Sequence, residues 1–386
     1  MLGAEQKQRA AGSLRLRGWA LEVLAGHAPT LPPPADAGTW ETFLRVERCA
    51  HPLRRGLAAA GLLDALDPAA RGVLEQRGVG EAVTALAVRH EAAHVGKLLD
   101  ARGWRGIVLK GGAAVVAGAC EVDAVDLDVL VRPEQCQAVA AELDTSGYSR
   151  KSADIAPDAP NRHEMAARTR HRGIPVEVHF ALAPPLEGDP WAGAVPLEVP
   201  GLLRLSPANH LWHVLQHATL HHSERRGLLR DVLVAAAAVR WCSGDELLEV
   251  ERRCAAHPRG VLPGRMLRMA RALAGGRVED PFRREATMAY LVYMTMLRYR
   301  PAHALLLALQ RTAFALVHGH GEYGGLWYGS HVSAIPRGYA GDTRLDARFP
   351  AAGVVGRVAW RSAHLAAAFA PAAWLARTAR RLADRA

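Results

Sequence analysis

The sequence contains few aromatic residues, few cysteines and almost no lysine. Aromatic side chains make up 6% of its 386 residues, while half of the chain is apolar, mainly alanine, valine and leucine. This composition favours packing of helices through small side chains over an aromatic-rich β-sandwich. With 22% charged residues, the chain has the composition of a globular protein long enough for two domains.

Cysteine is scarce, and the spacing of the cysteines matches neither a disulfide framework nor a zinc-binding motif. The chain has five cysteines, none in a CxxC pair: Cys49, Cys120, Cys136, Cys242 and Cys254. The odd number and the missing pairs argue against a disulfide framework and against a zinc ribbon.

Long apolar runs are also missing. The longest, residues 232–239 and 304–309, are far shorter than the roughly 20 residues that a membrane span needs. Residues 1–7 lack the apolar core of a signal peptide. We therefore expect a cytoplasmic protein without a transmembrane segment.

The charge of the chain is strongly positive and comes almost entirely from arginine. There are 44 arginines against 4 lysines, and the formal net charge is +10. Such a ratio is typical of a GC-rich genome and identifies no partner, although the excess charge favours anionic partners. One face of the last predicted helix carries Arg377, Arg380, Arg381 and Arg385. This face is interpreted either as a solvated helix surface or as a docking site for an anionic membrane surface or nucleic acid.

The pattern of apolar residues divides the chain into three regions. Residues 1–100 are predicted to be a helical N-terminal region, because residues 43–66 and 80–99 carry apolar side chains at three- and four-residue spacing. Residues 101–200 form the core, and residues 201–386 form a second helical region with a basic tail. The predicted fold class is α+β.

The middle region alternates between strand and helix patterns. Short apolar or alternating runs predict strands at residues 106–109, 126–131 and 175–180. Helices are predicted at residues 113–119 and from Pro133 to about residue 143. The result is a compact α+β unit.

Three acidic residues carry the strongest chemical signal. Asp126 and Asp128 lie two apart on a predicted strand, so they share a face with Cα atoms about 6.5–7 Å apart. Paired carboxylates repel unless a cation lies between them, which suits a Mg²⁺ site. Glu177 lies in a similar alternating pattern and could join them from a neighbouring strand. The alternative for Asp126 and Asp128 is a solvated strand edge.

A second pattern precedes these acids and suits a phosphate. Lys110, Gly111 and Gly112, here called the phosphate turn, follow a strand and open a predicted helix. Backbone N–H groups at such a turn bind phosphate, and the lysine would add positive charge. Each part alone is common, since a Gly-Gly pair is usually a simple turn and a lysine is usually on the surface. The order and spacing of the turn and the three acids together are much more specific.

These motifs resemble the DNA polymerase β-like nucleotidyltransferases, and within them an uncharacterised bacterial nucleotidyltransferase family. The resemblance rests on Leu-Lys-Gly at 109–111, Asp-Leu-Asp-Val-Leu-Val at 126–131, Gly-Tyr at 147–148 and Val-Glu-Val-His at 176–179. It continues through a later histidine-bearing helix and covers about residues 85–240. It implies a minimal nucleotidyltransferase core, a mixed β-sheet with helices, flanked by helical regions.

The resemblance also implies roles for the acids. Asp126 and Asp128 would ligate Mg²⁺, with Mn²⁺ as an alternative, and Glu177 would hold the catalytic metal and help to deprotonate the acceptor. The phosphate turn would bind the triphosphate. We also expect four residues to border the active cleft: His179, His217, His221 and Asp231.

Four histidines follow one another along a single helix face. His210, His213, His217 and His221 are separated by three, four and four residues. They are interpreted as packed or solvated helix residues, as phosphate- or acceptor-binding residues at the cleft, or as metal ligands. No cysteine and no HExxH motif supports zinc. A glycine- and aromatic-rich segment, residues 319–330, is either an acceptor-binding loop or an irregular surface connection.

The predicted reaction transfers a nucleoside monophosphate from an NTP, by default ATP, to a small-molecule, peptide or protein acceptor and releases pyrophosphate. The resemblance also implies a modified metabolite, since relatives lie beside genes for peptide natural products or surface polysaccharides, and natural product biosynthesis is the expected role. The family usually carries an arginine shortly before its paired acids, but residues 119–125 contain none. This departure supports a second hypothesis, a non-catalytic nucleotide-binding relative that acts as a partner or scaffold. A third, a nucleic-acid-binding module, rests on charge alone.

Overall fold

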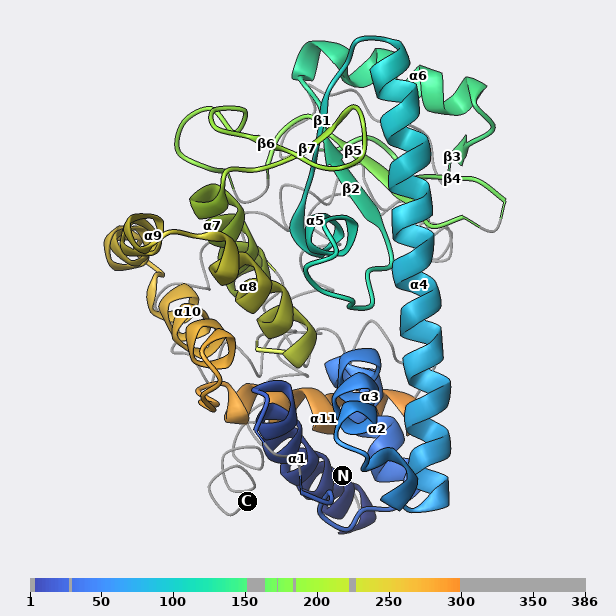
Figure 1. Ribbon diagram of the computed structural model, residues 1–386, viewed down its shortest axis with the longest axis vertical. Coiled ribbons are helices and arrows are strands. Elements are labelled where there is room, and N and C mark those ends of the chain that lie inside the picture. The colour runs from blue at the N-terminus through green and yellow to red at the C-terminus, as the bar shows by residue number, and fades with distance from the viewer. Residues whose placement is uncertain are drawn as a thin grey trace, which may run out of the picture.

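A computed structural model describes residues 4–27, 30–150, 164–171, 173–182, 185–221 and 227–298. The predicted arginine face near the end of the chain and the segment at 319–330 lie outside the described residues. The described part contains a mixed seven-stranded β-sheet with helices on either side of it in sequence. The expected α+β fold with helical flanks is therefore confirmed (Figure 1).

The N-terminal region is helical, as expected, but residues 43–66 do not form one helix. Arg48 has a left-handed backbone, with φ of 52°, and its N–H donates to the carbonyl of Leu44, which ends a helix there. The chain then turns and begins the next helix at Ala50. The elements of this region are α1 (Ala4–Leu24), α2 (Ala37–Glu47), α3 (Ala50–Ala59), η1 (Leu63–Ala65) and α4 (Pro68–Ala101).

Helix α4 connects the helical region to the sheet. It begins at Pro68, where the Asp67 side chain accepts hydrogen bonds from the N–H groups of Ala69 and Ala70. At a rise of about 1.5 Å per residue, its 34 residues span about 50 Å. One end packs against α2 and α3, and the other packs beside the strands (Figure 1).

The sheet has the order β3-β4-β5-β2-β1-β7-β6. At its centre β2 runs parallel to β5 and antiparallel to β1. The three predicted strands correspond to β1, β2 and β5, although residues 202–204, expected in a helical region, form β7 because they pair in parallel with β1. The strands are β1 (Gly106–Val108), β2 (Leu127–Leu130), β3 (Ser149–Arg150), β4 (Arg168–Thr169), β5 (Val176–His179), β6 (Val195–Pro196) and β7 (Leu202–Arg204).

The two faces of the sheet have different roles. One face, which includes Val108, Val129 and Val178, is buried in the main hydrophobic core together with the helices. Because side chains alternate along a strand, Ile107 and Leu130 point to the opposite face, where they form a smaller apolar cluster. Asp128 and Glu177 alternate with the core residues, so they lie on this second face.

Helices α4, α7 and α8 pack against α5. The predicted helix at 113–119 starts earlier, at Lys110, so Gly111 and Gly112 belong to its first turn. Helix α8 packs against α5, α7 and α10. No helix among the described residues is long and apolar enough to cross a membrane. These elements are α5 (Lys110–Val116), η2 (Pro133–Gln135), α6 (Cys136–Thr145), α7 (Pro207–Gln216), η3 (His217–His221), α8 (Leu229–Trp241), α9 (Gly244–Ala256), α10 (Val261–Ala274) and α11 (Arg283–Arg298).

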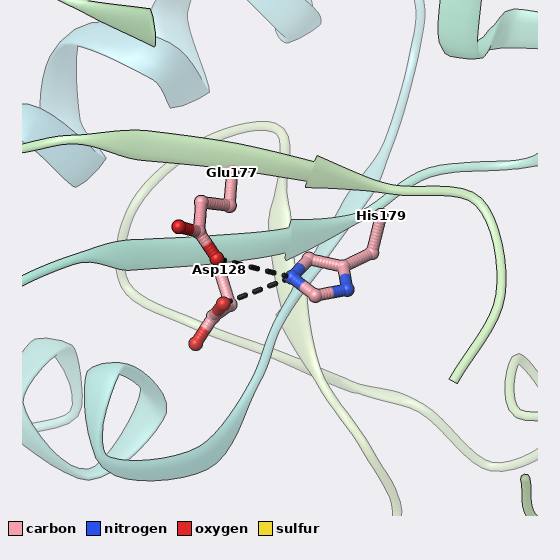
Figure 2. Close-up of side chains that lie close together, drawn as sticks. All are labelled: Asp128, Glu177 and His179. Carbon is pink, nitrogen blue, oxygen red and sulfur yellow. Dashed lines mark hydrogen bonds and ion pairs between the residues drawn. The ribbon is translucent and has the colours of Figure 1, made fainter. Parts of the chain in front are cut away.

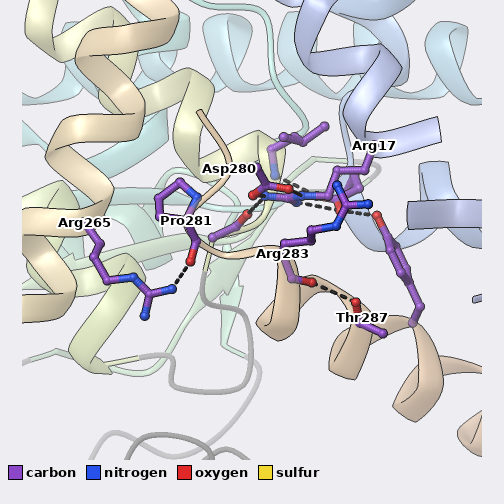
Figure 3. Close-up of polar contacts among 10 residues, drawn as sticks. Arg17, Arg265, Asp280, Pro281, Arg283 and Thr287 are labelled. Atoms are coloured by element: carbon purple, nitrogen blue, oxygen red, sulfur yellow. Dashed lines mark hydrogen bonds and ion pairs between the residues drawn. The ribbon is translucent and has the colours of Figure 1, made fainter. Parts of the chain in front are cut away.

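A buried ionic network fixes the start of α8. Arg17 in α1 donates to Glu47 at 2.7 Å, to Asp280 at 2.9 Å and to the carbonyl of Gly227 at 2.8 Å (Figure 3). The second oxygen of Glu47 accepts a hydrogen bond of 2.8 Å from the N–H of Leu229, the first residue of α8. Buried charges are tolerated when they are paired in this way. Residues far apart in the sequence therefore hold the beginning of α8 in one place.

Candidate active site

The pairing of β2 with β5 brings the predicted acids together. Asp128 lies directly opposite Glu177, and His179 follows two residues later on the same face. The Nε2 of His179 lies 2.8 Å from an Asp128 oxygen and 4.0 Å from a Glu177 oxygen (Figure 2). Asp126 immediately precedes β2. The two strands thus gather three carboxylates and one imidazole at one place on the sheet.

The carboxylates of this cluster are crowded. Burial, followed by the negative charges of Asp128, Glu164 and Asp126, raises the pKa of Glu177 to about 8. Burial and the charge of Asp128 raise the pKa of Asp126 above its usual value as well. Burial is the largest cause of both shifts, and repulsion between the ionised carboxylates, which an additional cation would reduce, adds to them.

Asp128 differs because it has two partners of its own. Burial alone would raise its pKa, but the charge of Lys110 and the hydrogen bond from His179 outweigh burial and hold the pKa well below its usual value. The Nζ of Lys110 lies 3.2 Å from the second Asp128 oxygen. In this structure Lys110 therefore contacts the acidic cluster, and its binding to phosphate stays a prediction.

The donor set fits a divalent cation. Asp128, Glu177 and His179 each offer one ligand atom, and these atoms lie within 4.8 Å of one another. Carboxylate oxygens suit Mg²⁺ and Mn²⁺, and an imidazole nitrogen is more usual with Mn²⁺ than with Mg²⁺. Burial is the largest cause of the raised pKa values of Glu177 and Asp126, and the negative charge of neighbouring carboxylates adds to it. A bound cation would offset this negative charge.

Comparison with known proteins agrees with this geometry. A family model described as uncharacterised nucleotidyltransferase matches residues 34–275, well over half of the chain. The chain belongs to this nucleotidyltransferase family. The match runs from the segment before α2 to the end of α10 and includes every strand of the sheet. The resemblance seen in the sequence is thereby confirmed. Neither the curated proteins nor the solved structures provide a match.

The two glycines of the phosphate turn allow close packing around it. A Cβ atom on Gly112 would lie 3.3 Å from Val108, which is tighter than most such contacts. On Gly111 it would lie 3.4 Å from Val234 and 3.9 Å from an Arg230 nitrogen, both in α8. The turn is therefore in contact with the sheet on one side and with α8 on the other.

The four histidines of the predicted helix face lie in two elements, α7 and η3. His210 and His213 are fully buried in α7, and burial lowers the pKa of both, in His210 to about 3. His213 also interacts electrostatically with Lys110, Asp128 and His179. Of the four histidines on the predicted helix face, His213 is thus one that interacts with the acidic cluster. The sequence had placed His217 and His221 at the cleft.

The two expected cleft histidines lie farther along. His217 begins η3, and its ring centroid is 6.2 Å from that of His213. Only the backbone of His221 is described. Asp231 lies in the first turn of α8, where its carboxylate is 3.9 Å from the Nε of Arg230. Their spacing in the sequence could not show that His213, among the four histidines, interacts with the acidic cluster.

Arginines from distant helices surround the segment before the paired acids. Residues 119–125 contain no arginine, but Asp123 accepts a 2.7 Å hydrogen bond from Arg48 at the end of α2. Glu121 similarly contacts Arg55 at 2.7 Å and His51 at 2.8 Å, both in α3. Arg48 and Arg230 also interact electrostatically with Asp126. No local pattern near residues 119–125 indicates these arginines, because each comes from another part of the chain.

Proposed function

We propose that the protein is a Mg²⁺-dependent nucleotidyltransferase that transfers a nucleoside monophosphate from an NTP, by default ATP, to an acceptor hydroxyl. The observation that supports this most strongly is the pairing of Asp128 with Glu177 across two parallel strands, with Asp126 just before them. Membership of the nucleotidyltransferase family makes this pair an active-site candidate instead of a structural ion cluster.

Asp126, Asp128 and Glu177 are the residues that would hold Mg²⁺. When bound, Mg²⁺ would neutralise charge on the triphosphate and on the leaving pyrophosphate. The side chain of Asp128 is 5% exposed, whereas that of Glu177 is 27% exposed. The more accessible Glu177 is therefore the carboxylate that an acceptor hydroxyl could approach.

The proposed reaction is an in-line displacement at the α-phosphorus. The acceptor oxygen forms a new bond to this phosphorus, while the bond from the α-phosphorus to the oxygen bridging to the β-phosphorus breaks. The hydroxyl proton passes to a carboxylate oxygen of Glu177. The electron pair of the broken bond leaves with pyrophosphate. The acceptor is a small molecule, a peptide or a protein.

The test is pyrophosphate release from each of the four NTPs with MgCl₂, first with water and then with a panel of hydroxyl-bearing metabolites and peptides. Parallel reactions with α-³²P-labelled NTP would detect transfer to protein. We expect one NTP to be preferred and the activity to disappear with EDTA. Binding of Mg²⁺ and NTP without pyrophosphate release under any condition would favour the non-catalytic scaffold instead.

A further inference from the structure

Arg230 lies close to the phosphate turn, although it belongs to the C-terminal helical region. It occupies the first turn of α8. One of its terminal nitrogens is 3.9 Å from the position that a Cβ on Gly111 would take. Its side chain is only 17% exposed and interacts electrostatically with Asp126. A guanidinium is therefore held beside the two features that would contact a nucleotide.

The guanidinium of Arg230 makes only weak polar contacts with the described part of the protein. In the described part of the chain, Nε of Arg230 has no hydrogen-bond partner, and its contact with Asp231 is long, at 3.9 Å. Its neighbours are engaged more closely: Arg48 donates to Asp123 at 2.7 Å and Lys110 lies 3.2 Å from Asp128. Since a largely buried charge is costly unless it is well paired, Arg230 is suited to an anion from outside the protein.

A neighbouring charge strengthens this argument. Arg48 repels Arg230 electrostatically, while Asp231, Asp126 and Asp123 attract it. An anion near both would relieve this repulsion, whereas a neutral ligand would not. Phosphate oxygens match the planar guanidinium, which can donate two parallel hydrogen bonds.

The position of Arg230 is also fixed before any ligand binds. The preceding residue, Leu229, donates its N–H to Glu47, and Glu47 is in turn held by Arg17. Arg17 binds the carbonyl of Gly227 just before α8 as well. A preorganised group loses little conformational freedom on binding, so more of its interaction energy appears as affinity.

We propose that Arg230 binds the polyphosphate of the nucleoside triphosphate beside Gly111. This inference rests on the proposed function for the identity of the ligand, but it adds a binding residue from α8, a region outside the sheet. The C-terminal helical region would then form part of the nucleotide site and distinguish triphosphates from nucleosides and monophosphates.

The test is calorimetric titration of the full chain with Mg²⁺ and ATP, AMP, adenosine or inorganic tripolyphosphate. Arg230→Gln should weaken ATP and tripolyphosphate binding by about tenfold to a hundredfold, the range for a hydrogen bond to a charged group. AMP binding should change far less, and adenosine binding should not change. Arg230→Lys should recover part of the loss. The matched control is Arg240→Gln, which removes an exposed arginine about 15 Å farther along α8.

Thermal unfolding without ligand checks that each variant folds. If Arg230→Gln is unstable, Arg230→Met and Arg230→Lys give the same comparison with a side chain of similar length. Equal ATP affinities for wild type, Arg230→Gln and Arg240→Gln would overturn the inference while leaving the proposed function intact. Loss of ATP binding through Arg230 in a protein that never releases pyrophosphate would support the inference and reject transfer. A wild type that binds neither NTP nor tripolyphosphate would overturn both.

Discussion

Lys110 reaches Asp128 from a strained backbone. Its Nζ lies 3.2 Å from the Asp128 carboxylate, while its φ of 52° places it in the left-handed region that residues with a Cβ rarely adopt. Strain of this kind costs of the order of 1–3 kcal/mol and is found where the surrounding structure imposes it, often at functional sites. The first residue of α5 thus combines a strained conformation with an ion pair inside the acidic cluster.

This relationship predicts different outcomes for two substitutions at residue 110. Lys110→Ala removes the ion pair and keeps the strain, whereas Lys110→Gly removes both, because glycine adopts positive φ freely. We expect Lys110→Gly to be more stable than Lys110→Ala by about 1 kcal/mol. Both variants should lose a similar fraction of Mg²⁺–ATP affinity. Urea unfolding and calorimetry measure the two effects, and a more stable alanine variant would contradict the role of the backbone.

The two aspartates should respond in opposite directions to neutralisation. From the sequence, repulsion between the paired acids predicts that an asparagine at either position stabilises the protein. In the structure Asp128 contacts Lys110 and His179, so this prediction now applies only to Asp126. Asp126→Asn removes a carboxylate with a raised pKa, so it should leave stability at pH 7 unchanged or slightly higher. Asp128→Asn should lower the unfolding free energy by roughly 1–3 kcal/mol, because it weakens contacts with Lys110 and His179.

The pH dependence distinguishes these variants further. The stability that ionised Asp128 contributes is present above the ordinary aspartate pKa and is lost as the pH falls through its depressed folded-state pKa. The difference between wild type and Asp128→Asn should therefore shrink in acid. Denaturation curves at pH 7 and in acid test this. Both variants should also bind Mg²⁺ and ATP less tightly than wild type does, and unchanged binding would remove these acids from the metal site.

Glu177→Gln should separate catalysis from binding. The amide keeps the size of the side chain but cannot accept the acceptor's proton, and a general base contributes about 10²–10⁴ in rate. We expect pyrophosphate release to fall by at least this factor, while ATP affinity changes only a few-fold. His179→Asn, two residues farther along the strand, should have a smaller effect on turnover. A fully active Glu177→Gln enzyme would reject the three-carboxylate mechanism.

Glu81 in α4 lies outside the acidic cluster, and we expect it to make the stability of the protein depend on pH. Its carboxylate accepts a 2.8 Å hydrogen bond from the N–H of His51, and burial raises its pKa to about 7. Between the ordinary glutamate pKa and about pH 7, the folded state binds this proton more tightly than the unfolded state does. Stability should consequently fall as the pH rises through this range, by about 1.4 kcal/mol for each unit of pKa difference.

Replacing Glu81 with glutamine should flatten this part of the stability profile. Unfolding in urea at pH 5 and pH 8 measures it, with Glu75→Gln on the same helix as the control. A profile that stays equally steep in Glu81→Gln would show that other groups are responsible.

The sequence contained enough information to predict the central strands and the acids they carry. Alternation and short apolar runs are local properties, and they correctly indicated β1, β2 and β5. The sequence could not establish that Asp128 lies opposite Glu177, because strand pairing depends on contacts between residues 49 positions apart. The break at Arg48 was missed for a different reason, since a non-glycine residue in the left-handed region has no strong sequence signal.

The groups around the acids were the hardest to predict. The contact of Lys110 with Asp128 was not predicted, and the binding of Lys110 to phosphate stays a prediction. Arg48 and Arg230 lie in separate helical regions, and only tertiary packing brings them near Asp126. The first helical region was given no chemical role from its sequence, yet it supplies arginines to the segment before β2 and holds the start of α8.

Because helix α4 contacts both the N-terminal helices and the sheet, it affects how the protein unfolds. Its N-terminal half packs on α2 and α3, and its C-terminal half, with Val95 and Leu99 buried, packs beside the sheet. Fraying of either half would expose apolar surface on the elements that it packs against. We therefore expect the helical region and the sheet to open together, so that the amide hydrogens along the buried side of α4 exchange slowly with solvent.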